Sequence, residues 1–83
     1  MVAEQVRKVV SEYVGRDVSM GSSLEIGLDL CTGDILDLVI ELESTFPVMI
    51  PDQDALRWVT VRDIADYIEP RAQLKKANHV SPA

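Results

Sequence analysis

The sequence lacks several features that assign a protein to a class at once. Its 83 residues include only one cysteine, one tryptophan, two tyrosines and one phenylalanine. A single thiol cannot close an internal disulfide, so a disulfide-stapled secreted domain is excluded. Since aromatic side chains are so few, the core must be built mainly from Val, Leu and Ile. No apolar run approaches the roughly 20 residues that span a bilayer, and charges interrupt the N-terminal segment, so we expect a cytoplasmic protein.

Motifs of catalysis and of metal binding are missing too. The one histidine, His79, has no second histidine beside it, and Cys31 is distant in sequence. The chain has no glycine-rich phosphate loop and no histidine near a nucleophile in its predicted folded part. We therefore expect a protein that is not an enzyme and binds no metal.

Positive charge is absent from the middle of the chain. No Lys or Arg occurs between Arg16 and Arg57, and the net charge is -6. The acidic residues of this interval are Asp17, Glu25, Asp29, Asp34, Asp37, Glu41, Glu43, Asp52 and Asp54. Such a field repels nucleic acids and anionic membranes and attracts basic protein surfaces. We expect a basic protein partner; the alternative is a solvated face that only aids solubility.

Two long segments have the apolar period of an amphipathic helix. Residues 3–14 place valines and a tyrosine at spacings of three and four, and Gly15 follows as a helix stop. Residues 33–46 repeat this pattern with Ile, Leu, Val and Phe, and Pro47 ends it.

Two further helices follow. Pro51 presets a turn and Asp52 can cap a short helix of about one and a half turns. Thr60 and Asp63 have the spacing of a capping box at the start of the last helix, and Pro70 is expected to end it.

Two segments read as irregular. Residues 15–31 form a long loop that its apolar side chains attach to the core; these are Val18, Leu24, Ile26, Leu28 and Leu30. Residues 71–83 form a basic, flexible tail. The sequence thus predicts an all-α domain over residues 1–70, a bundle of three longer helices plus one short helix. Its predicted core consists of Val6, Val10, Val14, Leu28, Leu38, Leu42, Phe46, Val61, Ile64 and Ile68.

This order of elements resembles the acyl carrier protein family over roughly residues 4–69. The stretches that carry the resemblance are "SSLEIGLDL", "DLVIELESTF", "IPD" and "TVRDIADYI". The resemblance implies a monomeric carrier without activity of its own. It would deliver acyl thioesters between a synthase, an acyl ligase or a transferase in fatty-acid, polyketide or similar biosynthesis.

The family's attachment motif is replaced in this chain. Family members begin the second helix with Asp-Ser-Leu, and the serine carries 4'-phosphopantetheine; the matching positions here are Cys31, Thr32 and Gly33. Two interpretations of Thr32 remain open: it is the N-cap of the second helix, or it carries the phosphopantetheine arm in place of serine. Its extra methyl group and its altered neighbours predict that the purified chain is largely unmodified. Ser23 is a poorer candidate because it lies deep in the loop.

The outer side of the second helix is the predicted partner-binding surface. Its residues are Asp34, Leu36, Asp37, Ile40 and Glu41. Acidic side chains around exposed aliphatic ones suit docking to a basic enzyme surface, and the resemblance implies the same role. The rival hypothesis is a degenerate carrier fold that only binds or regulates proteins and has no prosthetic group. A third is a chain in which the attachment motif was altered by engineering.

Overall fold

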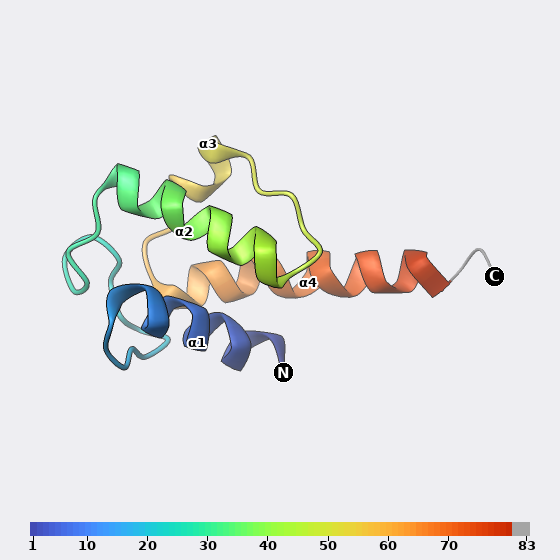
Figure 1. Ribbon diagram of the computed structural model, residues 1–83, viewed down its shortest axis with the longest axis horizontal. Coiled ribbons are helices and arrows are strands. Elements are labelled where there is room, and N and C mark those ends of the chain that lie inside the picture. Colours follow the sequence, from blue (N-terminus) through green and yellow to red (C-terminus); the bar gives the residue numbers. More distant parts are fainter. Residues whose placement is uncertain (81–83) are drawn as a thin grey trace.

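The computed structural model describes the backbone of residues 1–80 and the side chains of residues 1–72. It is all-helical over these residues, with no β-strand, and Figure 1 shows its four helices. They are α1 (Val2–Val14), α2 (Thr32–Thr45), α3 (Asp52–Ala55) and α4 (Val61–Val80). The predicted architecture of three longer helices, one short helix and a long first loop is confirmed.

The helix ends follow local chemistry. Gly15 ends α1 in the left-handed region at φ 80°, where its N–H bonds to the Ser11 carbonyl oxygen. At the start of α4, the Thr60 N–H donates to Asp63 Oδ2 at 3.1 Å, and the Asp63 N–H donates to Thr60 Oγ1 at 3.3 Å. The capping box predicted from the sequence is therefore present, with Asp in place of the usual Glu.

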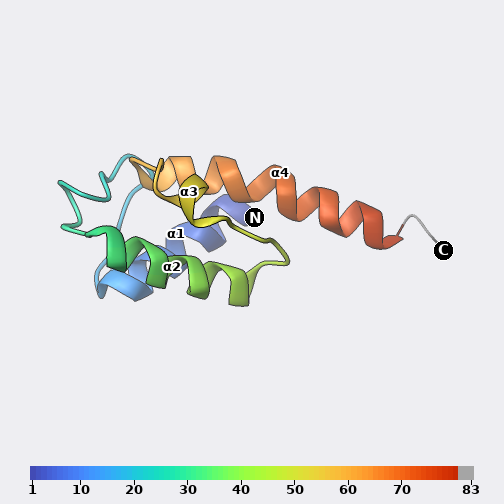
Figure 2. The same cartoon turned by 90° about the horizontal axis from the view of Figure 1, so that it is seen from above.

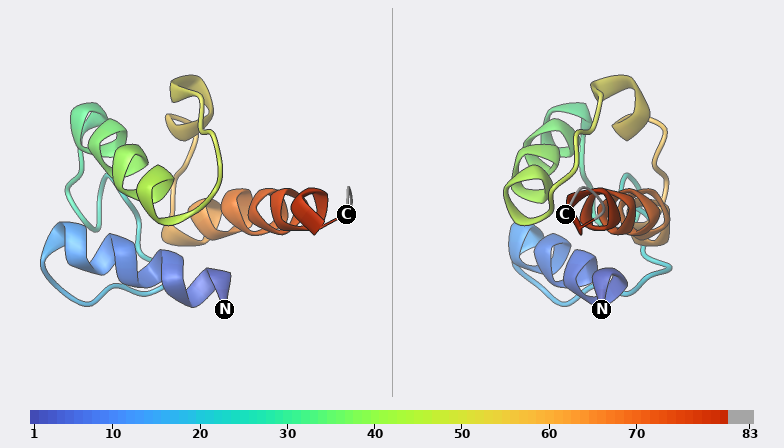
Figure 3. Two further views of the ribbon diagram at one scale, coloured as in Figure 1. Left: turned by 45° about the vertical axis from the view of Figure 1, so that its right-hand side comes forward. Right: turned by 90° about the vertical axis from the view of Figure 1, so that its right-hand side faces the viewer.

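The core lies where α1, α2 and α4 meet. Helix α1 packs against both α4 and α2, and α3 packs against α2; Figures 2 and 3 show this arrangement from other sides. Every residue of the predicted core is buried except Val14, which is half-buried against it. The core also contains Val18, Leu24, Leu30, Ile35, Val39, Ile50, Ala55, Ala65 and Ala72.

The long loop is attached to the bundle, with one exception to the prediction. Ile26 is 86% exposed, whereas the other four apolar side chains named above are buried. A single antiparallel bridge pairs Ser23 with Thr60. Beside it, the Leu24 N–H donates to the Val59 carbonyl oxygen at 2.8 Å. The loop is therefore held by backbone hydrogen bonds to the segment that leads into α4. The side chain of Ile26 is left exposed to solvent.

The prediction that Pro70 ends the last helix is wrong, because α4 continues through it to Val80. A proline inside a helix destabilises it by about 3 kcal/mol. Other contacts must therefore stabilise the turn that follows Pro70. Arg71 lies 3.7 Å from the centre of the Tyr67 ring and its guanidinium donates to the Tyr67 carbonyl oxygen at 2.9 Å. Ala72 is buried. These contacts hold the turn after Pro70, and Figure 1 shows α4 extending beyond the other helices.

The prediction of a flexible tail over residues 71–83 stays a prediction. Residues 81–83 lie outside the described part of the chain, as does the side chain of His79. Within the described part, no helix is both long enough and apolar enough to cross a bilayer.

Candidate functional site

The start of α2 is organised by Cys31 and Asp34. Cys31 is the N-cap, and its backbone N–H donates to Asp34 Oδ2 at 3.0 Å in a capping-box arrangement. This N–H lowers the pKa of the Asp34 carboxyl below its ordinary value. The interpretation of Thr32 as the N-cap is therefore wrong. The cap is Cys31, one residue before Thr32, because Asp34 is in the N3 position relative to Cys31. From there its carboxylate can accept from the Cys31 backbone N–H.

Thr32 is the first residue of α2, and its side chain is exposed. Its hydroxyl makes no hydrogen bond to any residue whose side chain the structure describes. The neighbouring Gly33 is exposed, and a Cβ there would have Cys31 Sγ as its nearest neighbour at 3.9 Å. The helix start thus presents an exposed threonine next to an exposed glycine.

A cleft of about 290 Å³ has Thr32 in its lining. The first loop, the start of α2 and the segment that follows α3 all contribute to it. Its lining residues are Ser23, Leu24, Glu25, Ile26, Leu30, Cys31, Thr32, Ile35, Ala55, Leu56, Arg57, Trp58 and Val59.

The lining of this cleft is mixed in character. Three of its apolar side chains are strongly exposed: Ile26 at 86%, Leu56 at 48% and Val59 at 61%. Glu25 and Arg57 are its charged side chains. Sequence reasoning missed the cleft, because its walls come from segments that are far apart in the chain.

The predicted partner-binding surface lies on α2, with a difference at one residue. We call it the α2 face, and its residues are Asp34, Leu36, Asp37, Ile40 and Glu41. Ile40 is 60% exposed, but Leu36 is half-buried and not exposed as predicted. Asp37 and Glu41 are exposed, and Asp34 is half-buried. The face therefore presents its two outer carboxylates and Ile40 to solvent.

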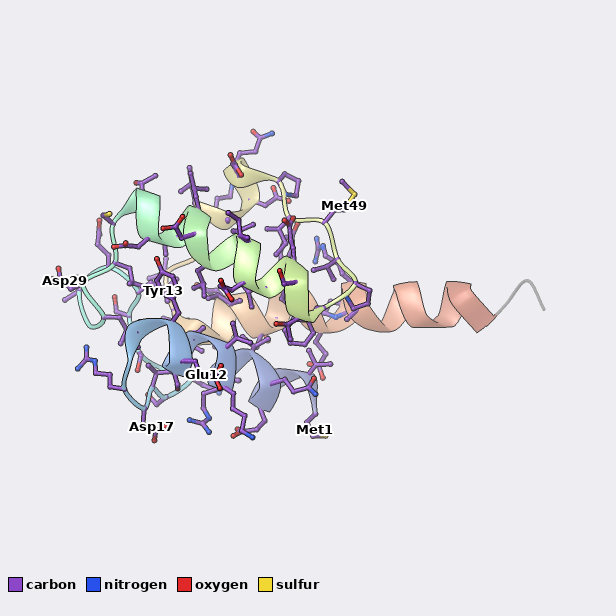
Figure 4. All side chains as sticks on the ribbon, viewed as in Figure 1. Met1, Glu12, Tyr13, Asp17, Asp29 and Met49 are labelled. Atoms are coloured by element: carbon purple, nitrogen blue, oxygen red, sulfur yellow. The ribbon has the colours of Figure 1, made fainter. Side chains whose placement is uncertain are left out.

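Helix α1 adds side chains to this surface that sequence reasoning missed. A groove between the helices is lined by Val9, Glu12, Tyr13, Glu41 and Thr45, and Figure 4 labels Glu12 and Tyr13 along this seam. The Tyr13 hydroxyl lies 3.5 Å from Asp37 Oδ2. Burial and then the charge of Asp37 raise the pKa of Tyr13.

Trp58 and Tyr67 have structural contacts. Their rings meet edge to face, with centroids 5.6 Å apart. The Tyr67 hydroxyl donates to Asp54 Oδ2 at 2.8 Å. Trp58 is half-buried and packs against the core. Among the residues with described side chains, no group of three or more His, Cys, Asp or Glu is placed to hold a metal ion.

No protein-family model matches the chain. The chain is 38% identical over 71 residues to the acyl carrier protein of Campylobacter lari strain RM2100, a match that covers 82% of this chain and 92% of that protein. The acyl carrier protein of Campylobacter concisus strain 13826 matches with the same identity and the same coverage.

Proposed function

Because the chain belongs to the acyl carrier protein family, whose members are carriers and not enzymes, we propose specific roles for two of its surfaces. Thr32 is the attachment point of 4'-phosphopantetheine. The α2 face docks the cytoplasmic biosynthetic enzymes that load and unload the carrier, which acts as a monomer.

The exposed Thr32 hydroxyl is the observation that carries the first role. It is not used as the helix cap, and it lies at the edge of a cleft. A helix N-terminus favours the negative charge of a phosphodiester. The residues present therefore fit the group, whose terminal thiol would hold the acyl chain as a thioester.

The same residues make attachment slow. The Thr32 hydroxyl is secondary and has a methyl group beside it, which hinders its attack on the diphosphate of coenzyme A. The acidic and leucine side chains that flank the family's serine are replaced by Cys31 and Gly33. Gly33 also weakens the first helical turn by up to about 1 kcal/mol relative to Ala. We therefore expect the chain to be isolated largely without its prosthetic group.

The charge pattern supports the docking role. The α2 face lies in the interval without any Lys or Arg, and Glu12 and Tyr13 of α1 extend it across a groove. Exposed carboxylates next to the 60% exposed Ile40 suit a partner that presents basic side chains around an apolar spot.

Charge reversal tests this docking. The pair Asp37→Lys and Glu41→Lys is expected to weaken binding to a partner synthase on the order of tenfold, because two exposed attractions become repulsions. Calorimetric titration measures the effect, and added salt should weaken binding of the unaltered chain, since exposed charges are screened over about 10 Å at 0.1 M.

The matched control for this test is the pair Asp66→Lys and Glu69→Lys on α4. It makes the same change in net charge away from the α2 face. Both double variants should keep the thermal midpoint of the unaltered chain. Equal loss of binding in both would show that only overall charge matters. No loss in either would show that the α2 face is merely solvated.

A carrier fold that binds proteins without a prosthetic group is the second candidate. The observation that favours it is the replacement of all three residues of the attachment motif. In that case the α2 face would still dock, and Thr32 would never be modified.

A further inference from the structure

We propose that Arg57 binds the phosphodiester that joins the arm to Thr32. This inference rests on the function proposed above and assigns a new role to a residue outside the α2 face.

Arg57 and Thr32 line the same cleft from opposite segments of the chain. Arg57 is the one Lys or Arg among the lining residues, and the preceding interval back to Arg16 contains no other. Its side chain is exposed. Among the residues with described side chains, its guanidinium makes no hydrogen bond and no ion pair. The guanidinium is therefore free to bind an anion in the cleft that Thr32 also lines.

The backbone around Arg57 is held in place. The Arg57 N–H donates to the Asp54 carbonyl oxygen at 3.1 Å, and the Trp58 N–H donates to the Ala55 carbonyl oxygen at 3.1 Å. Two residues later, the Val59 carbonyl oxygen accepts from Leu24 across the cleft wall at 2.8 Å. The backbone of Arg57 thus has a fixed position relative to the loop that leads into α2.

Several carboxylates lie in the grooves that Arg57 lines, and they compete with a phosphodiester for its guanidinium. Glu25 lines the cleft with it. Arg57 also lines a second groove of about 390 Å³, together with Asp54, Asp63, Asp66 and Arg71 among others. Two of these carboxylates are already engaged: Asp54 accepts from Tyr67, and Asp63 caps α4. A phosphodiester offers Arg57 two oxygens in the bidentate geometry that a guanidinium prefers.

The consequence is a defined position for the base of the arm. The other charges near Thr32 are negative, with Asp34 in the first turn of α2 and Glu25 in the lining of the cleft. Arg57 supplies the positive charge that offsets this field, and so the loaded chain is more stable than it would be without Arg57.

The test uses chain loaded with the arm, with loading verified by intact mass. On loading, the Nε–H resonance of Arg57 should shift in nitrogen-proton correlation spectra, and the thermal midpoint should rise. Arg57→Ala should lose most of that rise, Arg57→Lys should keep part of it, and Arg62→Ala on α4 should keep all of it. An unmoved Arg57 resonance, or an equal rise in Arg57→Ala and the unaltered chain, would overturn the inference.

A second chain separates this inference from the function on which it rests. The variant Cys31→Asp, Thr32→Ser, Gly33→Leu has the family's attachment motif, and it places the phosphodiester at the same residue number. If the unaltered chain cannot be loaded, the proposed function fails, and the Arg57 measurements are made on the loaded variant. A shifted Arg57 resonance there supports the phosphate contact, whereas an unmoved one overturns it.

Discussion

Leu42→Ala is expected to lower the free energy of unfolding by about 2–5 kcal/mol. Leu42 is fully buried in α2, where it belongs to the cluster formed by α1, α2 and α4. Truncation removes apolar contacts and leaves a cavity that a close-packed interior fills only in part. In a domain of this size, with a total stability on the order of 5–15 kcal/mol, such a loss is a large fraction of the whole.

Urea denaturation followed by circular dichroism measures the change. Ile40→Ala is the matched control, because Ile40 lies on the same helix and is 60% exposed. This substitution should change the free energy of unfolding by no more than about 0.5 kcal/mol. If Leu42→Ala is too unstable to fold, Leu42→Met, which typically costs less than about 1.5 kcal/mol, gives a measurable step in the same direction. Equal costs at the two positions would mean that α2 does not face the core as described.

Restoring the attachment motif is expected to speed loading by at least about tenfold, or about 1.4 kcal/mol in the barrier. In the variant Cys31→Asp, Thr32→Ser, Gly33→Leu, the hydroxyl becomes primary, and the side chains that family members offer to the transferase return. A side chain can begin at residue 33, because the nearest atom to an added Cβ, apart from the adjoining backbone, is Cys31 Sγ at 3.9 Å. Asp is also a favoured N-cap residue.

Two partial restorations separate the causes of slow loading. Thr32→Ser alone removes the methyl group, whereas Cys31→Asp and Gly33→Leu together restore only the flanking side chains. Because positioning losses compound in a transfer reaction, each step should recover part of the rate. Initial rates from intact-mass spectrometry at a fixed transferase concentration give the comparison. Equal rates in the unaltered chain and the full restoration would show that these three residues do not limit loading.

Most of the fold was predictable because it depends on local patterns. The stripes of Val, Leu and Ile mark the buried faces, and Gly15 and the Thr60–Asp63 box mark helix ends by chemistry that acts within a few residues. Pro70 misled the prediction because proline was read as a stop, although Arg71 can contact Tyr67 one turn back and Ala72 packs into the core. Ile26 was misplaced because an alternating pattern does not show which residue a loop turns outward.

The candidate site was predictable only where it lies on one element. The residues of the α2 face share a helix, so their spacing placed them together. The cleft beside Thr32 combines Ile26, Leu56 and Val59, whose proximity depends on the loop pairing with the segment before α4. The cap at Cys31 was missed because Thr is the commoner cap residue, and the sequence does not show that Asp34 reaches back to the preceding position.

Thr32 as the attachment point is the central claim, and intact-mass spectrometry tests it most directly. The chain is incubated for a prolonged period with a broad-specificity phosphopantetheinyl transferase, coenzyme A and Mg²⁺. We predict a gain of one phosphopantetheinyl group that is abolished in Thr32→Ala. A gain that survives Thr32→Ala but disappears in Ser23→Ala would move the site to the loop and contradict the claim. No gain in the unaltered chain, while the restored-motif variant is loaded under the same conditions, would also contradict it.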